Sequence, residues 1–286
     1  MGARRVIVVG AGAAGLAAGA LLVRRGAAVT VVEARDRIGG HIDTRECRRR
    51  REYRTRVPAD DLAILRWKSF AGLASLLLVL AAATFLPAGT LRFWQAWVYG
   101  AVFLGCTLLI TLHFLRSDPA LIQRRLAAGP AAERRPVQRI VQALASLCFL
   151  ALFVVAGLDH RLGWSSVPAP VSLAADALVA VGFAIVFLVF RENSHASAVI
   201  EVSAGQPVVS TGPYRRVRHP MYAGALLLLA ATPPALGTLV ALPLVAALAA
   251  VLVARIVDEE RLLSAELPGY RDYCREVRHR LVPHVW

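Results

Sequence analysis

Two polar segments near the carboxyl end of the chain carry residue types suited to binding a small charged cofactor. The first runs from Gly212 to Gly224 and reads GPYRRVRHPMYAG; the second runs from Arg255 to Glu260 and reads RIVDEE. Carboxylate and aromatic side chains stabilise a bound cation, and a histidine donates or accepts a proton near neutral pH. The carboxylate is that of Glu259, and the aromatic side chains are those of Tyr214 and Tyr222. The histidine is His219.

An apolar run from Ala225 to Ala254 joins these two segments. It is too long for one ordinary membrane span, and Pro233-Pro234 interrupts it. Because proline disfavours a helix interior, the run predicts a helix, a turn at the double proline and a second helix. Such a hairpin brings His219 and Glu259 to the same membrane face.

Four further apolar runs precede the hairpin, and their helices would pack beside it. Over the whole chain, 57% of the residues are hydrophobic. Each run approaches the ~20 residues that cross the hydrocarbon layer as a helix. We therefore expect an all-α integral membrane protein with about six transmembrane helices, the last two being the hairpin. The four runs are residues 69–86, 93–115, 140–158 and 172–190.

The distribution of arginine predicts the orientation in the bilayer. The connection between Arg116 and Arg139 is rich in arginine, whereas the connections near Gly89 and Gly163 carry one arginine each. Cytoplasmic loops carry an excess of positive charge, so we expect both termini and the Arg-rich loops in the cytoplasm. High alanine and arginine usage favours a bacterial inner membrane. Trp94, Trp97 and Trp164 would then lie at the opposite interface.

The formal net charge of +14 is compatible with loops seated on anionic lipid. The Arg-rich stretch from Arg48 to Arg56 has no interleaved aromatic pattern typical of nucleic-acid binding, so we expect the bilayer and not a nucleic acid as partner. The four cysteines (Cys47, Cys106, Cys148 and Cys274) have no metal-ligand spacing, and we expect no metal site and no disulfide framework.

The first residues of the chain show a different pattern. Residues 6–9 and 29–32 are short β-branched runs, and Gly10-x-Gly12-x-x-Gly15 follows the first of them. Glycines at this spacing, with Glu33 after the second run, are typical of a β-α-β dinucleotide-binding unit. Residues 1–44 resemble the start of flavin-dependent amine oxidases and phytoene desaturases. One such unit cannot bury a flavin, so we interpret residues 1–46 as a truncated Rossmann-like fragment, with no FAD or NAD expected there. Nucleotide binding by this fragment is the alternative.

Several ordered motifs from Glu192 onward resemble the isoprenylcysteine carboxyl methyltransferase family, which is related in its cofactor half to phospholipid N-methyltransferases. The resemblance is strongest over residues 192–286 and weaker over residues 60–191. Its motifs are Glu192-Asn193, Val208 to Tyr214, Arg218-His219-Pro220-x-Tyr222-x-Gly224, Arg255 with Glu259-Glu260-x-x-Leu263, Tyr270-x-x-Tyr273 and Arg280-x-x-Pro283.

The resemblance implies S-adenosyl-L-methionine as cofactor and methyl transfer to a lipophilic acceptor. Glu259 would hold the cofactor from the returning helix, and Arg255 would face the acceptor; these two are the expected catalytic residues. Where the eukaryotic enzymes have a polar amide, this chain has the apolar Ala198-Val199-Ile200, so one cofactor contact differs. The other expected cofactor residues are Gln206, Pro207, Val208, Val209, Tyr214, His219, Pro220, Met221 and Tyr222.

The predicted organisation is a fragment at 1–46, an Arg-rich linker at 47–66, four membrane helices at 67–190 and a cofactor region at 191–286 with its hairpin at 221–255. Two other interpretations stay open at this point. The chain could join a remnant of an FAD-dependent oxidoreductase to a membrane module without catalytic activity. His219 and Glu259 could also be ordinary residues at helix ends.

Overall fold

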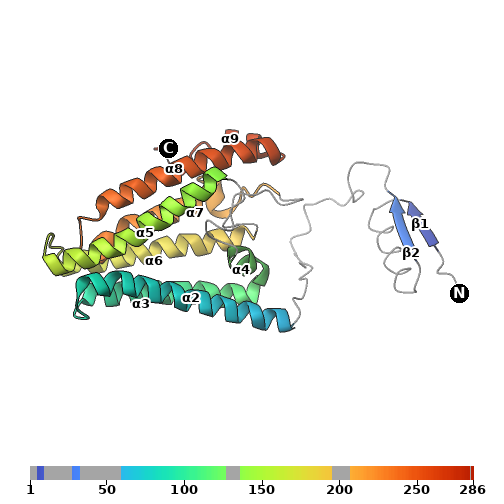
Figure 1. Cartoon of the computed structure of the whole chain (residues 1–286). Coiled ribbons are helices and arrows are strands. Elements are labelled where there is room, and N and C mark those ends of the chain that lie inside the picture. The colour runs from blue at the N-terminus through green and yellow to red at the C-terminus, as the bar shows by residue number, and fades with distance from the viewer. Residues whose placement is uncertain (1–4, 10–27, 33–58, 127–135, 195–206, 284) are drawn as a thin grey trace. The chain divides into compact units, whose positions relative to one another are not determined.

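The computed structural model describes residues 5–9, 28–32, 59–126, 136–194, 207–283 and 285–286 (Figure 1). The chain divides into two compact units, Met1–Arg56 and Val57–Trp286. Each unit is described by itself.

Two parallel strands are the described part of the first unit. Strand β1 (Arg5–Val9) pairs with β2 (Ala28–Val32), and Ile7 lies opposite Thr30. Both strands lie where the β-branched runs predicted them. The glycine motif between them is outside the described residues, so the complete β-α-β unit stays a prediction.

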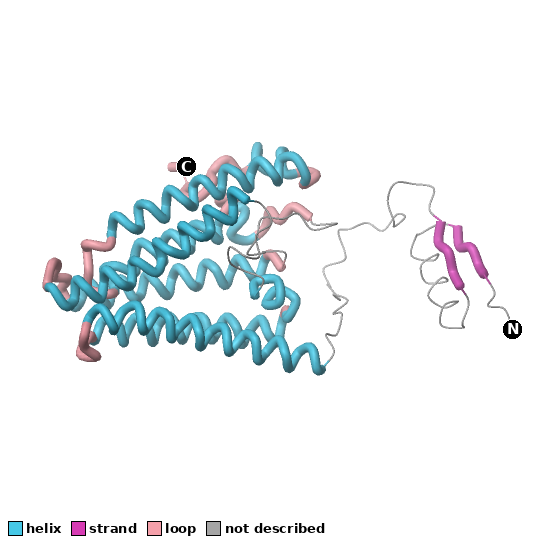
Figure 2. Tube along the Cα trace, viewed as in Figure 1, coloured by secondary structure: helices cyan, strands magenta, loops and turns pink. Residues whose placement is uncertain are grey.

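Helices make up the second unit (Figure 2). Long helices α2, α3, α5 and α6 run roughly alongside one another, and α7 and α8 lie beside them (Figure 1). In chain order the elements are α2 (Ala59–Ala88), α3 (Trp94–Ser117), α4 (Pro119–Leu126), α5 (Pro136–Leu162), α6 (Ala169–Glu192), the 3-10 helix η1 (Gly212–Arg215), α7 (Pro220–Ala235), α8 (Leu242–Glu266) and α9 (Tyr270–Glu276).

Four of these helices are long and apolar enough to cross a membrane, namely α2, α3, α5 and α6. Each contains one of the four predicted apolar runs, which confirms an integral membrane protein built on helices. The count of six crossings stays a prediction. Helix α7 has only 16 residues, or about 24 Å, and α8 carries Arg255, Asp258 and Glu259 in its second half.

Helix α2 begins at Ala59, inside the segment 47–66 that we expected to be a linker. Residues 59–66 are therefore helical, which corrects the end of that linker. Asp61 lies in the first turn of this helix, where an acidic residue beside the positive end of the helix dipole stabilises the helix start.

The turn between α7 and α8 lies after the double proline and not at it, which corrects the predicted position. Pro233 and Pro234 are in the last turn of α7. A proline lacks only its own N–H, and its carbonyl still accepts: Thr238 N donates to Pro233 O and Gly237 N to Pro234 O, both at 3.0 Å. The chain reverses at Gly237, whose φ of +73° is accessible mainly to glycine.

Helices α6 and α7 approach each other closely at two glycines. A Cβ added to Gly182 would lie 2.9 Å from the carbonyl oxygen of Gly224, and one added to Gly224 would lie 3.0 Å from that of Gly182. Small residues allow such close helix packing in membrane proteins. The contact fixes the first turns of α7, which carry His219 at the N-cap and Tyr222.

The helices have two ends with different chemistry. At the site end, α3 and α6 finish and α5 and α7 begin, and Arg116, Arg139 and Arg191 lie there. At the far end, Asp159 of α5 accepts hydrogen bonds from Ser165 N at 2.8 Å and from the hydroxyls of Ser165 and Thr238. The Asp159 carboxylate therefore links the α7–α8 turn to the α5–α6 connection through hydrogen bonds.

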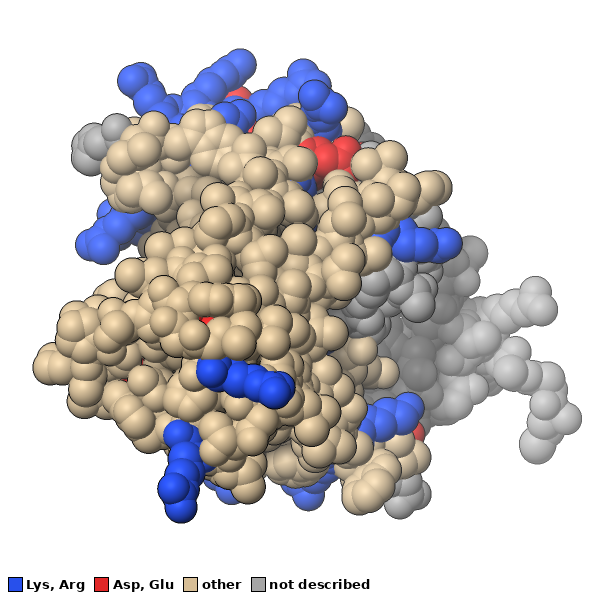
Figure 3. Space-filling view, turned by 60° about the vertical axis from the view of Figure 1, so that its left-hand side comes forward, with Lys and Arg blue, Asp and Glu red and all other residues tan. Residues whose placement is uncertain are grey.

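The helices carry large apolar side chains on their surface. Figure 3, turned so that the far end of the helices comes forward, shows a broad region with few charged side chains, and Lys and Arg lie mainly toward its margins. Large exposed apolar side chains include Leu78 and Leu86 of α2, Leu109 of α3 and Ile140 of α5. A continuous apolar surface of this kind suits contact with lipid chains.

Replacing Gly182 with Ala should destabilise the protein, because the new methyl group would meet the Gly224 backbone at 2.9 Å. We expect a loss of about 1–3 kcal/mol, the usual range for overpacking. Thermal unfolding of the full chain in detergent measures it. Gly105→Ala is the control, since a Cβ at Gly105 meets nothing within 4 Å. Equal melting temperatures for the two variants would contradict the close contact.

Candidate functional site

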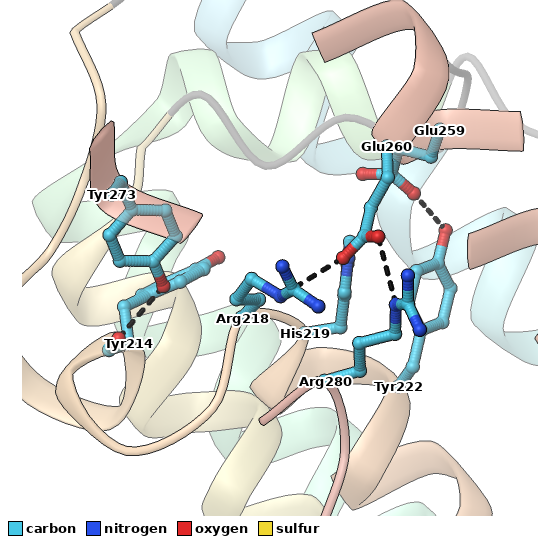
Figure 4. A network of polar contacts seen from close by, with 8 residues as sticks. All are labelled: Tyr214, Arg218, His219, Tyr222, Glu259, Glu260, Tyr273 and Arg280. Atoms are coloured by element: carbon cyan, nitrogen blue, oxygen red, sulfur yellow. Dashed lines mark hydrogen bonds and ion pairs between the residues drawn. The ribbon is translucent and has the colours of Figure 1, made fainter. Parts of the chain in front are cut away.

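A hydrogen-bonded chain links the start of α7 to the second half of α8 (Figure 4). The Tyr222 hydroxyl donates to Glu259 Oε2 at 2.7 Å, and Arg255 Nε donates to the same hydroxyl oxygen at 2.9 Å. Tyr222 and Arg255 are both only 8% exposed. The phenol thus lies between a carboxylate and a guanidinium, and its orientation is fixed by both.

Helix α5 extends this chain through a buried amide. Arg255 Nη1 donates to Gln138 Oε1 at 3.5 Å, and Gln138 Nε2 donates to Asp258 Oδ2 at 2.6 Å. Gln138 is 1% exposed. Since α5 is far from α8 in sequence, this amide positions Arg255 through tertiary packing.

Glu260 forms a second, separate cluster. Its Oε1 lies 3.1 Å from Arg218 Nε and 3.2 Å from His219 Nε2, and its Oε2 lies 2.8 Å from Arg280 Nε (Figure 4). Burial opposes ionisation of this carboxyl, but hydrogen bonds from His219 and Arg280 and the charge of Arg218 outweigh it and lower the pKa of Glu260. The carboxylate is therefore charged and acts as the common partner of three basic groups.

Backbone pairing brings Arg280 to this cluster. Arg218 N donates to His279 O and His219 N to Arg280 O, both at 2.9 Å. The Arg280 guanidinium also lies 5.0 Å from the centre of the Trp286 ring. The last residues of the chain are therefore part of the site and not an appended tail.

Tyr214 lies on the opposite side of the labelled group in Figure 4, against α9. Tyr273 Oη donates to the backbone oxygen of Tyr214 at 2.8 Å, and Asn193 Nδ2 donates to Tyr214 Oη at 3.1 Å. Burial raises the pKa of the Tyr214 phenol, and the Glu259 carboxylate adds to that effect. Asn193 and Tyr273 therefore hold Tyr214 in place.

A second arginine approaches from α4. The Arg125 guanidinium lies 4.9 Å from the centre of the Phe190 ring, and its Nη1 lies 3.7 Å from Met221 Sδ. The Arg125 guanidinium interacts electrostatically with Tyr222, Arg255 and Tyr214. Arg125 therefore adds positive charge to the side of the site formed by α4, α6 and α7.

Tyr270 has a buried hydroxyl without a hydrogen-bond partner among the described residues. It is 4% exposed, and both Glu260 and Arg218 act on it electrostatically. An unpaired buried hydroxyl is costly, and a bound ligand with a polar group would satisfy it. This tyrosine lies in the predicted Tyr270-x-x-Tyr273 motif but was not assigned a role from the sequence.

The structure brings several of the predicted site residues together. Tyr222 bonds to both Glu259 and Arg255, and His219 Nε2 lies 3.2 Å from Glu260, whereas Tyr214 lies on the α9 side of the group. Pro220 begins α7 and is buried, and Met221 packs beside Arg125. Val208 packs against the buried cluster of Leu267, Tyr270, Tyr273 and Val277. Pro207 is exposed and Val209 is half-buried; Gln206 lies outside the described residues.

Other contacts were missed by sequence reasoning. The partner of His219 is Glu260 and not Glu259, and the contributions of Arg218, Arg280, Gln138 and Arg125 were not predicted. Adjacent acidic residues look equivalent in a sequence, and only the packing of α8 separates them. In the described part of the chain, no group of three or more His, Cys, Asp or Glu could hold a metal ion.

Glu260→Gln should destabilise the protein by about 3 kcal/mol, because three basic groups would lose their common counter-charge. The folded pKa of Glu260 is lowered, so its stabilisation is present above the unfolded pKa of about 4.3 and is lost as pH falls through the folded pKa. The melting temperatures of wild type and variant should therefore converge once the pH is below the lowered pKa of folded Glu260.

Asp272→Asn is the matched control, since Asp272 and Arg275 form an ion pair in which both side chains are more than 70% exposed. We expect a change of about 0–1 kcal/mol there. A Glu260 variant no less stable than this control at neutral pH would contradict the role of the cluster.

Two family models match the chain in separate regions. Residues 171–267 match the phospholipid methyltransferase family, and residues 8–60 match the NAD(P)-binding Rossmann-like domain. The second match continues past Thr44, where we expected the resemblance to end. A search of curated proteins gave no match to the chain. Both matches agree with the sequence motifs, and the chain thus combines a segment similar to phospholipid methyltransferases with one similar to NAD(P)-binding Rossmann-like domains.

Proposed function

We propose that this protein is a membrane-embedded methyltransferase that binds S-adenosyl-L-methionine and methylates a lipophilic acceptor, with carboxyl O-methylation as the reaction. The observation that carries the proposal is the contact of Tyr222 with both Glu259 and Arg255, beside the Glu260 cluster. It lies inside the region that matches phospholipid methyltransferases. The match supports a methyltransferase, and the geometry supports the choice of residues.

The residues present fit this cofactor chemically. When bound, S-adenosyl-L-methionine supplies a methyl group on a positively charged sulfur. Glu259 and the rings of Tyr214 and Tyr222 provide carboxylate and aromatic groups for a cation. Arg218, His219 and the unpaired Tyr270 hydroxyl provide donors for an anionic or polar group.

If the acceptor is a carboxylate, methyl transfer needs no general acid or base from the protein. A carboxylate is already ionised near neutral pH. One of its oxygens forms a bond to the methyl carbon while the carbon–sulfur bond breaks, and no proton moves. The residues then act by positioning: Arg255 holds the acceptor carboxylate, and Tyr222 and Gln138 hold Arg255.

The location favours a lipophilic acceptor. The candidate residues lie at the end of the apolar helices α6, α7 and α8, where a molecule dissolved in the bilayer can reach them sideways. The water-soluble cofactor would enter from the Arg-rich side, which we propose is the cytoplasm. A site that excludes water also strengthens the interactions of Arg255 and Glu259 with their partners.

The Rossmann-like segment suggests a second candidate, nucleotide binding by residues 8–60. We propose that this segment takes no part in methyl transfer. Its two described strands would form only part of a dinucleotide-binding domain, and it belongs to a separate compact unit.

Calorimetry with S-adenosyl-L-methionine and detergent-purified protein tests the cofactor. We expect micromolar binding by the wild type and a loss of at least about tenfold in Glu259→Gln, because one carboxylate charge is removed near the bound cation. Glu266→Gln, at the exposed end of α8, removes the same charge outside the site and should bind like the wild type.

The same measurement on a chain beginning at Val57 separates the two candidates. Unchanged affinity would place the cofactor in the helical unit, while binding lost only on removal of residues 1–56 would reject our assignment. A well-folded wild type that binds no S-adenosyl-L-methionine would reject the methyltransferase as a whole.

Transfer of a radioactive methyl group to a farnesylated cysteine carboxylate tests the acceptor. We expect a base-labile ester to form, and Arg255→Lys to raise the KM for this acceptor by about tenfold, since lysine cannot form the paired hydrogen bonds of a guanidinium. Binding of the cofactor should change little in this variant. Methylation of a matched farnesyl amine in preference to the carboxylate would contradict carboxyl O-methylation.

A further inference from the structure

Asp176 is a buried acidic residue at the far end of α6. It is 4% exposed, and neither carboxyl oxygen has a hydrogen-bond partner among the described residues. A carboxylate without donors is costly to bury, above all in a membrane helix. Ionisable residues that persist in such helices mark candidate binding sites.

The hydroxyl groups around Asp176 have their protons engaged elsewhere. Thr232 Oγ1 of α7 donates to Leu228 O at 2.8 Å. Tyr99 of α3 lies 3.2 Å from Thr232 Oγ1 and must be the donor in that pair, because the Thr232 proton is already used. Tyr99 belongs to the same buried cluster as Ala175 and Val179 of α6, which lie on either side of Asp176, and it directs its proton toward Thr232.

A second buried oxygen atom beside Asp176 has no hydrogen-bond partner in the described structure. Ser172 Oγ is one turn before Asp176 on the same face of α6, and Ser172 is fully buried.

Asp159 is a buried carboxylate with a structural role, and its hydrogen bonds come from the protein itself. It is 1% exposed, at the same end of the helices, and it accepts hydrogen bonds from a backbone N–H and two hydroxyls. Asp176 is equally buried and has none. The difference indicates that the partner of Asp176 comes from outside the chain.

We propose that Asp176, Ser172 and Tyr99 form a binding site for a small monovalent cation such as sodium. Carboxylate and hydroxyl oxygens are ligands that hard cations prefer. The site contains one acidic group, so a single positive charge leaves it neutral, whereas a divalent ion would leave an uncompensated charge in a region of low dielectric.

This site is separate from the candidate methyltransferase site. Asp176 is sixteen residues from Glu192 along α6, or about 24 Å. The ligands come from α3 and α6, and Thr232, bonded to Tyr99, belongs to the hairpin helix α7. A bound cation would therefore stabilise the far end of α7, and the proposal does not depend on the reaction at the other end.

Thermal unfolding of the full chain in detergent tests the proposal, with sodium chloride compared with choline chloride at the same ionic strength and pH. We expect sodium to raise the melting temperature of the wild type by at least about 3 °C. Asp176→Asn, which has the same shape without the charge, should lose this rise. Equilibrium dialysis with radioactive sodium should find about one ion per wild-type chain and none in the variant.

Asp159→Asn is the matched control, because the Asp159 carboxylate of the wild type already accepts three hydrogen bonds. Sodium should still raise the melting temperature of this variant, even if the variant itself is less stable than the wild type. If sodium has no effect on the wild type and dialysis finds no bound ion, Asp176 is simply a protonated acid and the proposal is wrong. An equal sodium effect in wild type and Asp176→Asn would also overturn it, since the ion would then bind elsewhere.

Discussion

The partly buried charge of Glu260 is the interaction on which the rest of the candidate site depends. One carboxylate contacts Arg218 and His219 before α7 and Arg280 near the carboxyl end. Without it these basic groups would repel one another in a poorly hydrated place. With it, three segments distant in sequence are held at one point, and the first turn of α7 is fixed in front of α8. The positions of Tyr222 and Arg255 follow from that arrangement.

The hairpin is held at three levels along its length. At the site end the Glu260 cluster fixes its beginning, and one turn further along α7 Gly182 and Gly224 let α6 and α7 touch through their backbones. At the far end Asp159 bonds to Thr238 in its turn. Helix α7 has only 16 residues and contains two prolines, so its own backbone hydrogen bonds would not keep it helical in isolation. Contacts with the neighbouring helices stabilise it.

The sequence predicted what depends on local pattern and failed where packing decides. Apolar runs of nearly twenty residues were enough to place α2, α3, α5 and α6, and the β-branched runs placed β1 and β2. The double proline misled, because prolines can remain in the last turn of a helix: Pro233 and Pro234 lie there in α7, and their own carbonyls accept from Thr238 N and Gly237 N. Gln138 and Arg125 could not have been chosen, because nothing local marks a residue that meets α7 or α8 from elsewhere in the chain.

The adjacent acids Glu259 and Glu260 show why residue type alone does not assign a role. Successive residues of an α-helix point about 100° apart. Glu259 therefore meets Tyr222 while Glu260 meets Arg218, His219 and Arg280. Glu260 is neutralised by basic groups of the protein itself and organises the fold. Glu259 has a phenol as its direct partner and keeps its negative charge available to a ligand, which makes it the better candidate to face a cationic cofactor.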